Sequence, residues 1–175
     1  RRQRQMCIRD SFRVERELRH AIGAGELRLH LQSQVDVSGQ VTGAEVLVRW
    51  QHPRDGLVAP GVFIPVAEES DLIVSLGEWV LAHACALLAQ PVFRARRLRL
   101  SVNLSARQFR QAGFVGQLRA VLAATGADPR LLTLEVTEGL VIDDFDDAVA
   151  KMRALAALGV DLSLIHISEP TRQEA

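Results

Sequence analysis

Apolar residues recur along this chain with two different periods, and the two periods alternate from one segment to the next. A period near 3.6 residues is typical of an amphipathic helix, whereas alternation of apolar and polar residues is typical of a half-buried strand. Helical spacing is found in residues 12–22, 72–90, 114–124 and 143–158. Strand-like alternation is found in residues 27–35, 41–49, 98–104 and 131–137, and again from Val160 onward. The pattern therefore predicts helices and strands that follow one another along the chain.

Glycine and proline residues mark most of the boundaries between these segments. The pair Ser38–Gly39 predicts a turn between the first two strands. Two prolines and a glycine predict a loop over residues 51–61, and Pro91 is expected to end the helix before it. In the last helix we expect Phe145 and Leu155 to face the core.

Strands that alternate with helices of this length predict an α/β fold with a largely parallel sheet and helical crossovers. Such a sheet can close into a barrel or remain open as a doubly wound sheet. No glycine-rich phosphate loop follows the first strand, which counts against a dinucleotide-binding fold. Periodicity alone leaves the choice between barrel and open sheet undecided.

Composition narrows the class of protein. Hydrophobic residues make up 48% of the chain, enough for the sizeable core of a soluble domain. The 21 basic and 21 acidic residues balance, so no general attraction to a nucleic acid polymer is expected. No apolar run approaches the roughly 20 residues that span a bilayer, so we expect no membrane segment in this chain. Cys7 and Cys85 suggest neither a disulfide framework nor a metal cluster, and a reducing cytoplasmic location is the default interpretation.

The two ends of the chain resemble translated sequencing adapters. Back-translation of the opening residues 1–11 and of the closing residues 162–175 gives one inverted nucleotide sequence, similar to the transposon ends used in library preparation. We therefore expect both ends to be artefacts that pack poorly, with residues 12–26 as a lead-in helix and residues 27–161 as the domain proper.

Three strands each carry one oxygen-bearing side chain near the carboxyl end, namely Glu45, Asn103 and Glu135. In parallel α/β barrels, active sites are built at that end of the strands. Several converging carboxylates are costly to bury without a cation. An all-oxygen set favours Mg²⁺ or Mn²⁺ over zinc. Together the three residues predict a metal site, although each alone is compatible with an ion pair or an exposed strand face.

Four motifs occur in the order typical of EAL domains, and they carry a resemblance to that family. They are LHLQSQVD, GAEVLVRWQHP with FIPVAEES after it, SVNLSARQF, and LEVTE. The match covers residues 27–159. It implies a modified TIM barrel in which one strand runs against the others, and hydrolysis of cyclic-di-GMP to linear pGpG.

The resemblance also implies roles for single residues. Glu45, Asn103 and Glu135 resemble the family's metal ligands. Arg49 resembles the contact to a substrate phosphate, and Gln32 a contact to the bound dinucleotide. Glu138 resembles a supporting acid that orders the loop after the fifth strand.

Two residues depart from the family pattern. Val46 replaces the middle alanine, which we expect to matter little, and Ser33 replaces a proline beside Gln32, which puts substrate affinity in some doubt. The family's DDFGTG run should follow the fifth strand near Leu164, where this chain reads IHISEP. Its paired aspartates and later lysine have no counterpart here.

The chain is therefore expected to be a truncated piece of a bacterial cyclic-di-GMP phosphodiesterase. About five of eight barrel strands are present, so we expect this piece to be inactive by itself. An alternative is a degenerate EAL domain that acts as a non-catalytic cyclic-di-GMP receptor or as a protein-interaction module. An unrelated metal-dependent barrel enzyme is disfavoured by the four ordered motifs. The resemblance is also compatible with a homodimer of the complete domain, and with membrane association through upstream domains.

Overall fold

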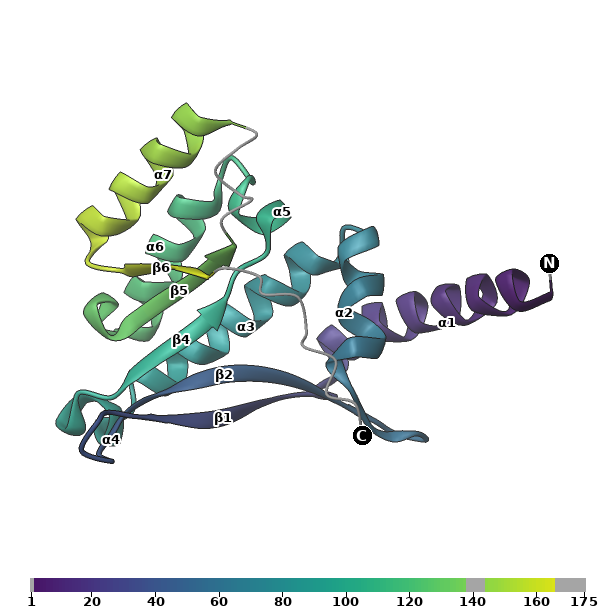
Figure 1. Ribbon diagram of the computed structural model, residues 1–175, viewed down its shortest axis with the longest axis horizontal. Coiled ribbons are helices and arrows are strands. Elements are labelled where there is room, and N and C mark those ends of the chain that lie inside the picture. The colour runs from purple at the N-terminus through teal and green to yellow at the C-terminus, as the bar shows by residue number, and fades with distance from the viewer. Residues whose placement is uncertain (1, 138–143, 166–175) are drawn as a thin grey trace.

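Strands from along the whole chain pair into one curved sheet in this computed structural model, which describes residues 2–137 and 144–165, with side chains from Asp10 onward (Figure 1). Within those residues the sheet has the order β1-β2-β4-β5-β6, and the short β3 pairs with β2. The strands are β1 (Leu27–Val35), β2 (Val41–His52), β3 (Gly56–Val58), β4 (Arg99–Asn103), β5 (Leu132–Thr137) and β6 (Asp161–Ile165).

Helices precede the first strand and connect the parallel strands of the sheet. They are α1 (Arg2–Ala24), α2 (Pro60–Glu69), α3 (Leu72–Leu88), α4 (Pro91–Arg96), α5 (Ala106–Phe109), α6 (Phe114–Thr125) and α7 (Phe145–Leu158), with a 3-10 turn at Pro129–Leu131. The long helices α3, α6 and α7 pack on one face of the sheet (Figure 1).

Strand direction confirms the expected α/β class. Strands β2, β4, β5 and β6 are parallel, and each crossover between them contains helices. Strand β1 runs antiparallel to β2, with Gln32 opposite Glu45. In the part of the chain that the structure describes, β1 and β6 each lack a partner on their outer side, so the curved sheet does not close.

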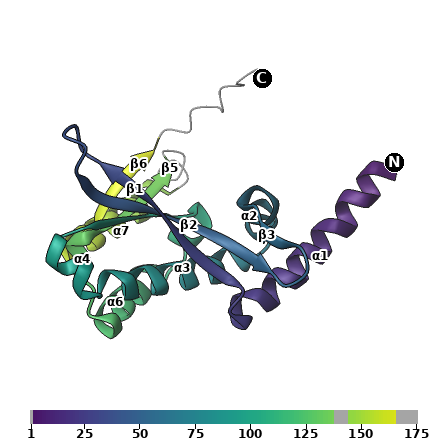
Figure 2. The same ribbon diagram turned by 90° about the horizontal axis from the view of Figure 1, so that it is seen from below.

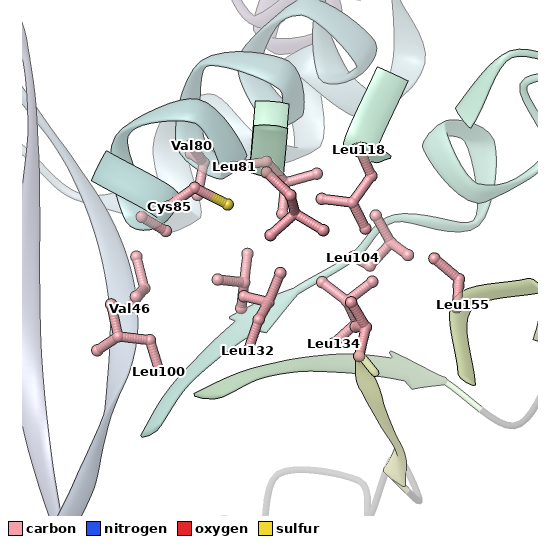
Figure 3. Close-up of a cluster of buried hydrophobic side chains, with 14 of the residues drawn as sticks. Val46, Val80, Leu81, Cys85, Leu100, Leu104, Leu118, Leu132, Leu134 and Leu155 are labelled. Carbon is pink, nitrogen blue, oxygen red and sulfur yellow. The ribbon is translucent and has the colours of Figure 1, made fainter. Parts of the chain in front are cut away.

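The larger core lies between the parallel strands and the three long helices (Figure 3). Alternate residues of β4 and β5 point into it: Leu100, Val102, Leu132 and Leu134 are at most 1% exposed. Burying a side chain of this size contributes about 1.5–3 kcal/mol. Helix α6 ends at Gly126, whose φ of 70° is costly for other residues.

A smaller core joins α1 and α2 to the β1–β2 hairpin. Trp50 and Phe63 form its centre, with ring centroids 5.9 Å apart in an edge-to-face arrangement. Two polar contacts tie α1 and the residues after it to β2: Glu26 accepts a hydrogen bond from the Trp50 indole at 3.0 Å, and Glu17 bonds the buried His52 ring at 3.1 Å. Since His52 Nδ1 accepts from the backbone N–H groups of Arg54 and Asp55, this histidine is structural.

Two local expectations are wrong. Residues 51–61 are not one loop, because β2 continues to His52, β3 pairs back onto it, and α2 starts at Pro60. A proline at the first helical position loses no hydrogen bond. The helix before Pro91 does end as expected, at Leu88, and Pro91 itself begins α4. Phe145 is 64% exposed, since its helix turns Ala148, Lys151 and Leu155 inward instead.

The ends of the chain differ from expectation as well. Helix α1 begins at Arg2, well before residue 12, and its first turns extend away from the sheet (Figure 2). Residues 162–165, expected to lie outside the domain, belong to β6 and pair with β5 up to Thr137 opposite Ile165. Residues 166–175 lie outside the described part of the chain. The origin of both ends stays a prediction.

Candidate functional site

The two faces of the parallel sheet carry opposite chemistry because side chains alternate along each strand. On β4, Leu100 and Val102 face the helices, whereas Ser101 and Asn103 face away from them. The same alternation places Glu135 of β5 and Glu45 of β2 on the polar face.

Strand register brings the three expected ligands to one place, near the carboxyl ends of β4 and β5 but in the first half of β2, which continues to His52. Asn103 lies beside Glu135 on the neighbouring strand, and Glu45 lies beside Ser101, two residues before Asn103. The Asn103 side chain reaches across, and its Nδ2 donates a hydrogen bond to Glu45 Oε1 at 3.0 Å. Residues separated by about ninety positions in sequence thus share one polar cluster, which we define as Glu45, Asn103 and Glu135.

Electrostatics within this cluster favour a bound cation. Partial burial and the nearby negative charge of Glu45 raise the pKa of Glu135, and a hydrogen bond from Ser101 opposes the shift. Two carboxylates that repel each other beside an amide are a donor set of oxygens that suits a hard divalent ion. Among the described residues, no three histidine, cysteine, aspartate or glutamate side chains gather into a group that could hold a metal ion.

Ser101 and Thr133 lie on the same face of the sheet as the cluster, two residues before Asn103 and Glu135 on β4 and β5. They are 6% and 8% exposed, and they occupy adjacent register positions on β4 and β5. Small hydroxyl side chains leave room for the carboxylates above them and can hydrogen-bond them. The hydrogen bond from Ser101 to Glu135 therefore orients the carboxylate from below.

A groove of about 500 Å³ adjoins the cluster. Its walls come from the end of β2, from α2 and α3, and from the segment that joins β4 to α5. Ile64, Ile73 and Leu76 make much of the lining apolar, and Asn103 and Glu135 also line it. A groove with apolar walls and a few polar groups is typical of a site for a small organic ligand.

The two residues expected to contact the substrate are placed differently. Arg49 lines the groove, and its Nη1 donates to the backbone carbonyl of Val48 at 3.0 Å. Gln32 is exposed on β1, directly opposite Glu45. Glu138 lies outside the described residues.

Sequence patterns missed one polar residue of the groove, Gln108 on α5. Its side chain is 3% exposed and lines the groove next to Gly77 of α3. Gln108 lies within the motif SVNLSARQF, but its burial against Gly77 could not be read from the sequence, because the contact joins two helices far apart in the chain. Within residues 2–137 and 144–165, no helix is long and apolar enough to cross a membrane.

Comparison with known proteins shows which family the chain resembles. The family model described as the EAL domain matches residues 15–168. MucR of Pseudomonas aeruginosa, named a bifunctional diguanylate cyclase/cyclic di-GMP phosphodiesterase, is 38% identical over 165 residues, which are 89% of this chain and 23% of MucR. NbdA of the same organism, named a cyclic di-GMP phosphodiesterase, is 36% identical over 92% of this chain and 21% of its own length. The chain thus spans about a fifth to a quarter of these relatives.

Solved structures show the same likeness. The PaMucR phosphodiesterase in complex with c-di-GMP has a TM-score of 0.81 and 39% sequence identity, over 87% of this chain and 62% of that one. The EAL enzyme Bd1971 with cAMP and cyclic-di-GMP bound has a TM-score of 0.82 and 27% identity, over 90% of this chain and 44% of that one.

Proposed function

Because the chain belongs to the EAL domain family, we propose that the complete domain is a metal-dependent phosphodiesterase that hydrolyses cyclic-di-GMP to linear pGpG. By complete domain we mean these residues together with the strands that would continue the sheet beyond β6. The fold of the family is TIM-barrel-like, and the curved sheet described above is an incomplete barrel of that kind.

One observation carries the proposal: Asn103 and Glu135 at the carboxyl ends of β4 and β5 meet Glu45 of the longer strand β2, beside a groove of a size for a small ligand. In TIM barrels this end of the sheet holds the active site. Fold likeness alone does not imply function, so the proposal rests on these side chains.

The oxygen atoms of Glu45, Asn103 and Glu135 would hold Mg²⁺ or Mn²⁺. When bound, such a cation stabilises negative charge on a phosphate and lowers the pKa of a coordinated water. Asn103 keeps Glu45 in place through its hydrogen bond, and Ser101 does the same for Glu135. Their geometry therefore depends on contacts within β4.

Arg49 would bind a phosphate of the substrate. Its guanidinium donates a hydrogen bond to the backbone carbonyl of Val48, and it would exchange this contact for two phosphate oxygens that match its planar edge. The apolar walls of the groove would accommodate a base of the dinucleotide. In the reaction one water adds across one phosphodiester bond, which breaks one phosphorus–oxygen bond and leaves a linear dinucleotide with a terminal phosphate.

We propose further that residues 1–175 alone do not perform this reaction. The sheet edges at β1 and β6 are unpaired among the described residues, and its polar face has no strands opposite it. Such edges promote aggregation, and the missing part of the barrel would contribute to both burial and the site.

The decisive experiment measures pGpG release by chromatography. The purified complete domain is incubated with cyclic-di-GMP and Mg²⁺ or Mn²⁺, and in parallel with EDTA. We expect turnover only with the metal. Binding without cleavage under all conditions would instead support the receptor alternative, and turnover by residues 1–175 alone would contradict the requirement for the rest of the barrel.

A further inference from the structure

Gln108 is a buried polar residue for which the fold provides no hydrogen-bond partner at the donor end. The residue is 3% exposed, and among the described residues its Nε2 has no partner. Buried side-chain donors are nearly always bonded, because a desolvated donor without an acceptor is costly. An amide in the wall of a groove with no partner among residues 2–137 and 144–165 therefore points to a bond made to a group outside those residues, and a ligand in the groove is one such group.

The position of this amide is set from two sides. Ser105 caps α5 by accepting a hydrogen bond from the Gln108 backbone N–H at 3.1 Å, which fixes the start of the side chain. Gly77 of α3 lies against its far end, where a methyl group on Gly77 would overlap the amide. Because Gly77 has no side chain, it leaves space for the Gln108 amide, and the Cβ of any other residue would occupy that space.

The amide lies in the wall of the groove that ends at the polar cluster. Apolar side chains of α3, among them Ile73 and Leu76, make up the wall around it. Arg49, Asn103 and Glu135 line the same groove. A ligand whose phosphate reaches Arg49 can therefore extend its base along the apolar wall toward Gln108.

We propose that Gln108 is a specificity-determining residue, whose Nε2 donates a hydrogen bond to the O6 carbonyl of a guanine base of cyclic-di-GMP. This inference rests on the function proposed above. Guanine presents O6 as an acceptor, whereas adenine presents an amino donor at the same place. The terminal torsion of glutamine is soft, so the amide can turn toward a base in the groove.

The test compares side chains of similar shape at position 108. Gln108→Met keeps the volume and removes the donor, and Gln108→Glu replaces the donor by an acceptor. Gln111→Met is the matched control, because Gln111 is an exposed glutamine just beyond the same short helix. Each variant of the complete domain is titrated calorimetrically with cyclic-di-GMP and with cyclic-di-AMP, and KM and kcat are measured for cyclic-di-GMP.

We expect Gln108→Met to weaken cyclic-di-GMP binding by about fivefold to a hundredfold, with a matching rise in KM and little change in kcat. Gln108→Glu should lose cyclic-di-GMP affinity and shift the preference toward cyclic-di-AMP, whose amino group can donate to the carboxylate. Gln111→Met should behave as the wild type. Circular dichroism checks that each variant is folded, and if the Met variant is not, the Glu variant decides.

Unchanged affinity and unchanged base preference in folded Gln108 variants would overturn the inference, and would leave Gln108 as a packing residue. A wild-type domain that binds neither cyclic dinucleotide would instead refute the proposed function itself. Loss of affinity in the Met variant but not in the Glu variant would contradict donation to O6.

Discussion

The two faces of the parallel sheet are made by adjacent residues of the same strands, yet they serve different purposes. On β5, Leu134 is fully buried against the helices, and Glu135 beside it belongs to the polar cluster. One face consists of close-packed aliphatic side chains, and the other gathers carboxylates, an amide and hydroxyl groups. In this fold, the residues that stabilise the core and the residues that carry polar groups are therefore a single step apart along a strand.

This separation has a physical basis. Apolar burial against α3, α6 and α7 supplies the free energy of folding, so the polar face is free to carry groups that repel each other. Substitutions on the helix-covered face should therefore change stability, and substitutions on the polar face should change activity with little loss of stability.

The largest effect is expected from Glu45→Ala on the polar face. Loss of this carboxylate should lower the turnover of cyclic-di-GMP by the complete domain about 10³-fold or more, the upper range for removing one preorganised electrostatic group. The melting temperature should stay close to that of the wild type. Glu78→Ala, at an exposed position of α3, is the control and should keep full turnover. Substantial turnover by the Glu45 variant would remove this residue from the site.

Leu134→Ala tests the opposite face. The truncation leaves a cavity under α6 and α7 and should lower the free energy of unfolding by about 2–5 kcal/mol, measured by urea denaturation of the complete domain. Leu57→Ala on β3, where the side chain is 56% exposed, should cost little. Equal losses for the two variants would mean that the helix-covered face does not form the main core.

Cys85 of α3 lies in the same core, and the reactivity of its thiol tests how closely α3 packs on the sheet. Burial raises the pKa of its thiol from 9.0 to about 11, so the thiolate fraction at pH 8 falls about a hundredfold. In a Cys7→Ser background, alkylation by iodoacetamide should be at least that much slower in the folded domain than in urea. Mass spectrometry follows the reaction, and rapid alkylation of the folded domain would be inconsistent with the packing of α3.

The smallest effect is expected from Glu135→Gln without metal. Because burial and Glu45 raise the pKa of Glu135, the folded state binds its proton more tightly than the unfolded state does. Stability is therefore lost as the pH rises from the ordinary value of 4.5 through the raised pKa. In EDTA at pH 7 the variant should be more stable than the wild type by less than about 1 kcal/mol, and this difference should vanish below pH 4.5.

Thermal unfolding at several pH values measures this difference. A variant less stable than the wild type at neutral pH would show that Glu135 makes a favourable contact that outweighs the repulsion from Glu45. Activity should fall in either case, because the variant loses a carboxylate of the polar cluster.

Much of the fold could be predicted from the sequence because its signals are local. Strand β1 has the expected bounds, and α3, α6 and β5 agree to within two residues. The prediction failed where local signals were ambiguous. Proline suggested a loop at Pro60 although proline is also suited to begin a helix, and Phe145 fits the period of α7 but lies at its exposed first turn.

By itself, the sequence determined the alternation along each strand, and with it the identity of the three oxygen-bearing side chains. Only the tertiary structure decided that they meet, since the register of β2 against β4 lets Asn103 reach Glu45. The same holds for Gln108, whose orphaned amide exists only because α5 and α3 approach each other at Gly77. Periodicity is a property of neighbours in the chain, whereas hydrogen bonds and burial depend on neighbours in space.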